Sequence, residues 1–193
     1  INDLTLAAGC GTPGVHISFP TSSLLLKTFN RDEGWVLDTL ETLVQFARKY
    51  FDRVSVGAQD ATRTDRKFLI RFARAAASAG AEQLRLADTV GMISPVMVME
   101  LIRDIRRNAP GIGLEFHGHN DLGMATANAV SAVDAGADAV SVTVNGLGER
   151  AGNSPLEEVV MALFEVGGSQ KNLQTRQLAE LCQFVARASG RAI

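Results

Sequence analysis

The stretch Leu114-Glu115-Phe116-His117-Gly118-His119-Asn120-Asp121-Leu122-Gly123 decides how this chain is interpreted. It begins with the residue pattern of a strand and ends in residues that are typical of turns. Side chains two residues apart in a strand share one face, so Glu115, His117 and His119 are expected on the same side. The polar residues that follow place the histidine pair at the carboxyl end of the strand, where ligands bind in α/β folds.

The spacing of the two histidines permits two interpretations. Two imidazoles about two strand residues apart can bind one divalent ion, and histidine suits Zn, Fe, Co or Mn. Two half-buried strand histidines that hydrogen-bond to their neighbours would leave the same pattern. The pair alone therefore leaves a metal site and a structural role open.

Strand-like and helix-like segments alternate along the rest of the chain. Strands are expected at residues 14–19, 54–58, 84–88, 114–119 and 139–144. Helices are expected at residues 3–9, 32–50, 68–80, 95–108, 123–135 and 175–189, and after the capping-box pattern Ser154-Pro155-Leu156-Glu157. The alternation predicts a parallel sheet with right-handed crossovers. Similar Ala-Gly-Ala turns at residues 79–81 and 135–137 suggest an internal repeat, which favours a TIM barrel over an open doubly wound sheet. No G-x-G-x-x-G segment follows a strand, so a dinucleotide-binding sheet is not favoured.

Composition narrows the class of protein. The chain has 193 residues, of which 46% are hydrophobic and 21% charged, as expected for one globular domain. A net charge of -2 gives no support for nucleic-acid binding, and no apolar run is long enough for a membrane span. Cys10 and Cys182 have neither zinc-site nor disulfide spacing, which together with the lack of a signal peptide favours the cytoplasm. Because Ile1 begins inside a helix-like segment, we expect the chain to be part of a longer protein.

Polar residues gather where the expected strands end. In a barrel they would converge on one mouth, where such enzymes work, although polar residues also simply end strands and cap helices. The second explanation does not account for the polar, glycine-rich residues 145–153. The residues concerned are His16, Ser18, Gln59, Asp60, Asp88, Thr89, His117, His119, Asn120, Asn145, Glu149 and Asn153. Arg63 and Arg150 are candidate partners for an anionic substrate, with solvated surface arginines as the alternative.

Two segments together carry a family resemblance. Residues 117–128 (HGHNDLGMATAN), followed by residues 145–153 (NGLGERAGN), closely resemble the second signature of the homocitrate and 2-isopropylmalate synthases. The similarity continues through Asp60-Ala61-Thr62-Arg63 and Ala87-Asp88-Thr89-Val90-Gly91 and covers nearly the whole chain. Members of that family are metal-dependent TIM-barrel enzymes that condense acetyl-CoA with a 2-oxo acid.

The resemblance also sets the expected extent of the domain. It implies a single catalytic barrel domain at residues 1–193 that is incomplete at its N-terminus and holds roughly the last five βα units of a (β/α)₈ barrel. The family's D-x-T-L-R-D-G segment, which supplies an Asp ligand, a catalytic Arg and a Glu, is not in this sequence. Neither is the downstream subdomain that contributes a catalytic His to a partner's site. We expect the full-length protein to be a homodimer.

Site roles transfer from the family residue by residue. The implied ligands of a divalent ion, which could be Mg, Mn, Zn, Co or Fe, are His117, His119 and Asn153. The family's threonine that holds the carboxylate of the oxo acid transfers to Thr89, and His16 and Arg150 are further candidates for substrate binding. Gln59 and Glu149 are the catalytic candidates, but the family usually has Glu where this chain has Gln59. An amide hydrogen-bonds but cannot transfer a proton.

The function implied is a Claisen-type condensation of acetyl-CoA with a 2-oxo dicarboxylic acid, 2-oxoglutarate to homocitrate. Residues 125–128 and 144–147 look more like the homocitrate branch, whereas His16 with Thr21-Ser22 looks more like the isopropylmalate branch. A 2-isopropylmalate or citramalate synthase is therefore an open alternative. A non-catalytic homologue that binds a metal or an oxo acid is another, motivated by Gln59 and the truncated barrel.

Overall fold

The computed structural model describes residues 1–165 and 175–191 and contains one parallel five-stranded sheet in the order β1-β2-β3-β4-β5. The strands are β1 (Gly14–Pro20), β2 (Arg53–Gln59), β3 (Gln83–Asp88), β4 (Gly113–Gly118) and β5 (Ala139–Ser141). Every neighbouring pair is parallel. A doubly wound sheet would reverse its strand order at a switch point. The consecutive order therefore identifies the described residues as part of a TIM barrel, as predicted.

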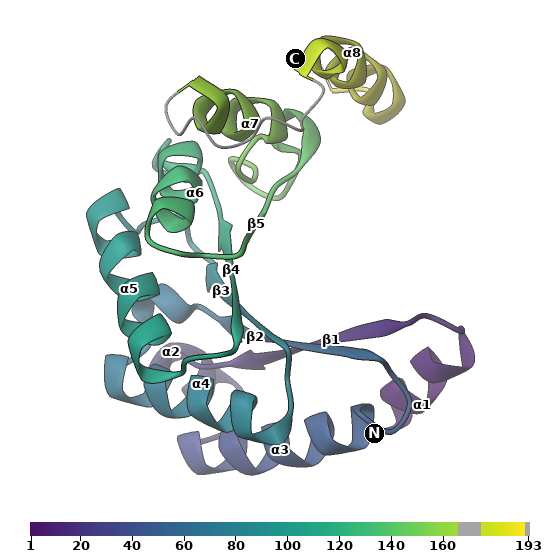
Figure 1. Cartoon of the computed structure of the whole chain (residues 1–193), viewed down its shortest axis with the longest axis vertical. Helices are drawn as coiled ribbons and strands as arrows, with labels where there is room; N and C mark the ends of the chain where they lie inside the picture. The colour runs from purple at the N-terminus through teal and green to yellow at the C-terminus, as the bar shows by residue number, and fades with distance from the viewer. Residues whose placement is uncertain (166–174, 192–193) are drawn as a thin grey trace.

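Helices connect the strands and cover one side of the sheet. They are α1 (Asn2–Gly9), α2 (Ser23–Thr28), α3 (Glu33–Ala47), α4 (Arg66–Ala79), α5 (Pro95–Asn108), α6 (Ala125–Asp134), α7 (Leu156–Glu165) and α8 (Leu178–Ser189), with 3₁₀ turns η1 (Ala61–Arg63), η2 (Val144–Gly146) and η3 (Thr175–Gln177). The curved sheet carries α3, α4, α5 and α6 on its outer side, and its inner face is open (Figure 1). The structure therefore presents a wall of a barrel with its interior accessible.

Alternation along the strands separates the two faces of the sheet. Leu84, Leu86, Leu114 and Phe116 are fully buried beneath the helices. The residues between them are polar or charged and face the barrel interior, as expected for a period of two. Burial of the outward residues against the helices supplies the hydrophobic stabilisation, which leaves the inner face available for chemistry.

The start of α7 differs from the expected capping box. Pro155 forms an isolated bridge with Thr143, and its carbonyl accepts the first helical hydrogen bond, from Val159 N–H at 3.0 Å. The Ser154 hydroxyl donates to the Ala125 carbonyl instead of capping the helix, at 3.1 Å. The Glu157 carboxylate accepts from Asn145 N–H at 3.0 Å. Tertiary contacts thus replace the local cap, because Ser154 is fully buried between β4 and α6.

Three other boundaries differ from the prediction. The fifth strand ends at Ser141 and is followed by η2, in which Asn145 has a left-handed φ of 57°. The fourth strand ends at Gly118, so His119 lies just beyond it in an isolated bridge with Asn153. The short helix α2, capped by Ser22, lies in a segment for which no helix or strand was expected. In the described part of the chain, no helix is long and apolar enough to cross a membrane.

Candidate functional site

The register of the strands stacks the inward-facing side chains in layers. The lower layer contains His16, Ser55 and Gln83; the middle layer Ser18, Gly57, Arg85 and Glu115; the upper layer Gln59, Ala87 and His117. Successive layers are two strand residues, or about 6.6 Å, apart. Thr89 and His119 follow at the carboxyl ends. Depth in the barrel can therefore be assigned to each candidate residue.

The upper cleft, at the carboxyl ends of the strands, has a volume of about 370 Å³. It contains six of the eight predicted site residues, and only His16 and Arg150 lie outside its lining. The lining residues are Ser18, Gly57, Ala58, Gln59, Arg85, Ala87, Thr89, His117, His119, Glu149 and Asn153. The expected mouth thus exists, with the histidine pair facing the barrel interior.

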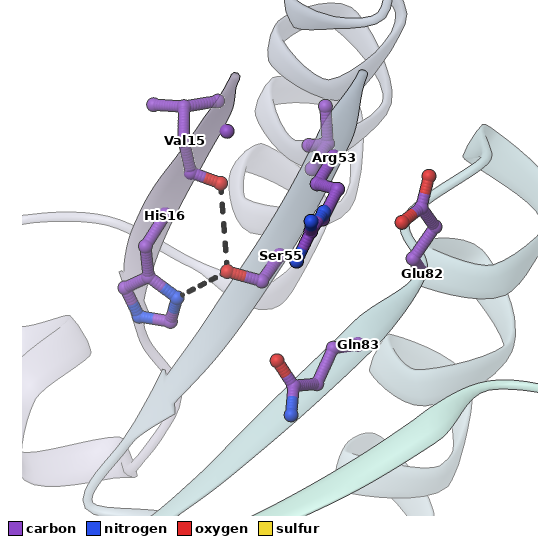
Figure 2. Close-up of a pocket in the computed structure, with 8 residues that line it drawn as sticks. Val15, His16, Arg53, Ser55, Glu82 and Gln83 are labelled. Carbon is purple, nitrogen blue, oxygen red and sulfur yellow. Dashed lines mark hydrogen bonds between the residues drawn. The ribbon is translucent and has the colours of Figure 1, made fainter. Parts of the chain in front are cut away.

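His16 lies deeper than the mouth at which it was expected. It lines a lower cleft of about 310 Å³, where its Nδ1 is 2.8 Å from Ser55 Oγ (Figure 2). Its ring reaches upward under the middle layer, because a β-carbon on Gly57 would lie 2.7 Å from His16 Nε2. Burial, followed by the charge of Arg85, lowers the pKa of His16 to about 4. The substrate-binding role of His16 stays a prediction.

The imidazoles of His117 and His119 are neighbours at the upper cleft. Their ring centroids are 4.7 Å apart and the rings are nearly perpendicular, at 79°. His119 Nδ1 lies 2.9 Å from the Asp88 carbonyl oxygen, so Nδ1 carries the ring proton and Nε2 keeps a free lone pair. That is the usual way in which an outer hydrogen bond orients a metal-binding histidine. His119 Nε2 faces the Glu149 carboxylate at 3.7 Å.

Burial keeps His117 neutral. Burial is the main cause that lowers the pKa of His117 to about 4. His119, when protonated, and Arg85 act in the same direction, and Glu149 acts against them. His117 Nδ1 is buried and has no hydrogen-bond partner among the described residues. A neutral imidazole with a free nitrogen is the form in which histidine binds metal ions.

Asn153 is positioned by a tight glycine-rich turn. Its Nδ2 donates to the Leu147 carbonyl at 2.7 Å, which leaves Oδ1 buried without a partner in the described residues. A β-carbon on Gly148 would lie 2.4 Å from Asn153 Nδ2. Gly152 has a φ of 94°, and a β-carbon there would lie 2.3 Å from the Gly146 carbonyl oxygen. The glycines therefore let the turn pack closely enough to aim Asn153 at the histidines.

A fully buried aspartate connects the end of β3 to its neighbours. The Asp88 carboxylate accepts hydrogen bonds from the Thr62 hydroxyl at 2.9 Å and from Met92 and Ile93 N–H, both at 3.3 Å. Its carbonyl orients His119, as described above. The hydroxyl of the following residue, Thr89, accepts from Asp60 N–H at 2.8 Å. Both Thr89 and His119 are thus fixed by one segment.

Gln59 and Glu149 lie on opposite sides of the upper cleft. Gln59 ends β2, and its carbonyl accepts from the Thr21 hydroxyl at 2.8 Å. No side-chain hydrogen bond of its amide occurs within residues 1–165 or 175–191, so the amide is available to a ligand. Glu149 is largely exposed and is the only carboxylate lining the upper cleft in the described part of the chain.

The two candidate arginines are engaged in protein contacts. Arg63 pairs with buried Asp60, with Nε at 2.8 and 3.0 Å from the two carboxylate oxygens. Arg150 donates to Asp121, Glu149 and the Thr89 carbonyl, which ties the glycine-rich turn to the end of β3. Its guanidinium therefore lies at the rim, where a substrate would have to compete with three acceptors. The predicted substrate contact of Arg150 has no direct counterpart in this geometry.

One residue of the upper cleft was missed in the sequence. Arg85 in β3 donates through Nε to Glu115 in β4 at 2.8 Å, inside the barrel. Alternation places Arg85 on the same face as Ala87 and opposite to buried Leu84 and Leu86. A charged residue at an interior position of a parallel strand was the available signal.

The arrangement fits part of a metal shell. Two neutral imidazole nitrogens and one amide oxygen are suitable ligands for a divalent ion. His117 Nδ1 and Asn153 Oδ1 are buried and have no hydrogen-bond partner among the described residues. In the part of the chain that the structure describes, no three His, Cys, Asp or Glu side chains are grouped for metal binding. The described residues thus supply neutral ligands but no anionic one.

Comparison with known proteins defines the family. A sequence profile described as HMGL-like matches residues 1–185. The 2-isopropylmalate synthase 2 of Caldanaerobacter subterraneus subsp. tengcongensis is 47% identical over 194 residues, covering 100% of this chain and 50% of that protein. Homocitrate synthase 1 of Nostoc sp. is 41% identical over 191 residues, covering 98% of this chain and 50% of that protein. The (R)-citramalate synthase of Methanocaldococcus jannaschii is 40% identical over 186 residues, covering 96% of this chain and 38% of that protein.

Solved structures support the fold. The HMG-CoA lyase of Bacillus subtilis superposes with a TM-score of 0.86 at 21% identity, covering 100% of this chain and 68% of that chain. The carboxyl transferase domain of Rhizobium etli pyruvate carboxylase gives a TM-score of 0.68 at 20% identity, covering 78% of this chain and 26% of that chain. The fold defines a TIM-barrel type of protein whose candidate site residues line the carboxyl ends of the strands. The chain belongs to the HMGL-like family, and it spans about half the length of the curated relatives named first.

Gly152→Ala should destabilise the protein more than Gly136→Ala. Both glycines have a left-handed φ, 94° and 101°, so alanine costs each roughly 1–2 kcal/mol of backbone strain. Only Gly152 also has a carbonyl oxygen in the way, and overpacking adds roughly 1–3 kcal/mol. Chemical denaturation of both variants measures the difference. Equal losses would show that the turn can relax around a β-carbon.

The free energy of unfolding should fall as the pH is lowered from 7 toward 4. The pKa of His16 is about 4 when folded and 6.5 in its ordinary state, so the unfolded chain takes up this proton first. The contribution of neutral His16 to the free energy of unfolding is therefore fully present above pH 6.5, and it is lost as the pH falls from 6.5 to about 4. His16→Gln should make the pH dependence of the denaturation midpoint shallower, with the remaining slope due to groups such as His117, whose pKa is also about 4. An unchanged profile would assign the effect to other groups.

Proposed function

We propose that the full-length protein condenses acetyl-CoA with a 2-oxo acid in a divalent-metal-dependent Claisen-type reaction. The observation that carries this proposal is the convergence of His117, His119, Asn153 and Thr89 on one cleft at the carboxyl ends of the strands. Relatives that are 37–47% identical to the chain over the aligned residues are named isopropylmalate, homocitrate and citramalate synthases. The upper cleft is the place where such chemistry would occur in a TIM barrel.

The reaction requires a carbanion equivalent and an activated ketone. A proton leaves the acetyl methyl group, and that carbon forms a bond to the ketone carbon of the oxo acid. The ketone oxygen takes up a proton, and water cleaves the thioester to release CoA. When bound, a divalent ion would act as a Lewis acid that polarises the ketone.

His117, His119 and Asn153 are the residues that would hold the metal ion. Burial keeps His117 neutral, the Asp88 carbonyl fixes the tautomer of His119, and the glycine-rich turn presents Asn153 Oδ1. Because all three are uncharged, a bound ion would keep its full charge for an anionic substrate. An acidic ligand from elsewhere in the full-length protein would complete the shell.

The remaining residues of the upper cleft would position the substrate. Thr89, held by Asp60 N–H, is the proposed contact of the oxo-acid carboxylate, and the Gln59 amide can hydrogen-bond across the cleft. Glu149 faces His119 and can orient it or accept a proton through water. Gln59 cannot transfer a proton, so in this proposal it is a positioning group.

The oxo acid that we propose is 2-oxoglutarate, which would make the product homocitrate. The relative at 47% identity favours 2-oxoisovalerate and hence isopropylmalate as the second candidate. We propose a homodimer as the assembly. A homologue that binds metal and oxo acid without turnover is the competing class, because Gln59 replaces the glutamate that is usual in the family. Acetyl-CoA-dependent release of free thiol with each oxo acid, measured on the full-length protein, decides among these candidates.

His119→Ala should lower turnover of the full-length protein by at least about 100-fold, since metal polarisation is worth several kcal/mol. Stoichiometric metal content, measured after dialysis, should fall in parallel. His119 is buried and its Nδ1 bonds to the Asp88 carbonyl, so turnover and metal content should be compared at a temperature at which circular dichroism shows both proteins folded. Gln45→Ala on the outer surface of α3 is the control and should match the wild type. Full activity in metal-stripped protein would contradict the assignment.

Gln59→Glu separates two roles for this position. If the position assists proton transfer, the new carboxylate should raise kcat while KM for the oxo acid stays constant. General acid–base groups contribute on the order of 10²–10⁴ in rate, so the gain should be measurable. If Gln59 only positions the substrate, repulsion between two anions should raise KM at constant kcat. Steady-state kinetics distinguish the two results.

A further inference from the structure

Arg85 is a cation placed inside the barrel. Its side chain is about one third exposed, and it lines the upper cleft together with His117 and Thr89. Its strand neighbours in the middle layer are Gly57 and Glu115. A charged group is expensive to place in a barrel interior without partners, so its presence requires an explanation.

Glu115 explains only part of the bonding capacity of Arg85. Within the described residues, the guanidinium makes one hydrogen bond, from Nε to Glu115 Oε1. An arginine carries five N–H donors, and its two terminal nitrogens form the fork that binds a carboxylate through both oxygens. In Arg85 that fork has no acceptor from the described chain. Glu115 therefore anchors the side chain without occupying the end that faces the cleft.

The depth of Arg85 matches a substrate that extends downward from the mouth. Arg85 lies in the middle layer and His117 in the upper layer, about 6.6 Å apart along the strands. A 2-oxo acid held at the histidines by its ketone end would project its far end toward this layer. A short methylene chain spans that distance.

The surroundings of Arg85 favour an anion over an apolar side chain. Ser18 contributes a hydroxyl to the same layer, and Gly57 between Ser18 and Arg85 contributes no side chain. His16 reaches this layer from below, and its Nε2 is buried without a partner in the described part of the chain. An apolar substrate tail here would strip water from the guanidinium without replacing its hydrogen bonds.

We propose that Arg85, with Ser18 and His16 beside it, forms the subsite for a second carboxylate and selects 2-oxo dicarboxylic acids. The inference rests on the proposed condensation function and specifies its substrate class. The terminal nitrogens of Arg85 bind the distal carboxylate, and Glu115 holds the guanidinium in place. The upper cleft thus reads both ends of the substrate.

The test compares substrates in Arg85→Gln of the full-length protein. With acetyl-CoA, the wild type should prefer 2-oxoglutarate to 2-oxoisovalerate. Loss of a charge-assisted contact should raise KM for 2-oxoglutarate by about 10–100-fold. KM for 2-oxoisovalerate should change less than about threefold, which a general loss of structure would not reproduce. Arg48→Gln, which breaks an outer ion pair with Glu82, is the matched control and should leave both constants unchanged.

Removal of Arg85 also leaves Glu115 unpaired, so the double variant Arg85→Gln/Glu115→Gln is needed. It should show the same selective defect as Arg85→Gln with a restored denaturation midpoint. Equal losses for both oxo acids in both variants would overturn the proposal, as would a wild type that prefers 2-oxoisovalerate.

If no oxo acid releases CoA, the condensation function fails. Calorimetric binding of 2-oxoglutarate still decides on Arg85, since weaker binding in the variant supports the subsite and equal binding overturns it.

Discussion

The hydrogen bonds of buried Asp88 are the constraint on which the rest of the site depends. Its carboxylate holds the loop after β3 through Met92 and Ile93, and its carbonyl fixes His119. Asn128 in α6 donates to the Ile93 carbonyl at 2.8 Å, which attaches the same loop to the next helix. A carboxylate with no exposed surface is stable only when it is bonded in this way. The hydrogen bonds that Asp88 requires therefore fix the ends of β3 and β4 relative to each other.

The glycine-rich turn at residues 145–153 adds the second constraint. Gly152 and Gly148 allow backbone and side chain to approach at distances that any β-carbon would block. Asn120 N–H donates to the Gly152 carbonyl at 2.9 Å, and Arg150 reaches Asp121 and the Thr89 carbonyl. The turn is thereby tied to β3 and β4 from outside the cleft. This explains why Arg150 lies at the rim, although its position in the motif suggested a contact with substrate.

Much of the fold was predictable because strand and helix periods are local properties. Leu84 and Leu86 alternate with Arg85, and this pattern identifies both the strand and its two faces. The mouth residues were predictable because parallel strands place their carboxyl ends together. Depth was not predictable, since the relative register of neighbouring strands depends on tertiary packing. His16 was therefore expected too high, and Arg85 was not recognised as a cleft residue. The capping box failed for the same reason, because Ser154 bonds across the fold.

The charge of Arg85 connects the depth of the cleft with its mouth. Burial is the main cause of the low pKa of His117, and Arg85 acts in the same direction from one layer below. The cation that would attract an anionic substrate also disfavours protonation of the imidazole above it. A neutral imidazole keeps the lone pair that a metal ion requires. Glu115 binds Nε of Arg85, and the two terminal nitrogens keep their donors free of acceptors from the described residues. Arg85 thus supplies the positive charge of the middle layer and adds to the effect of burial on His117 above it.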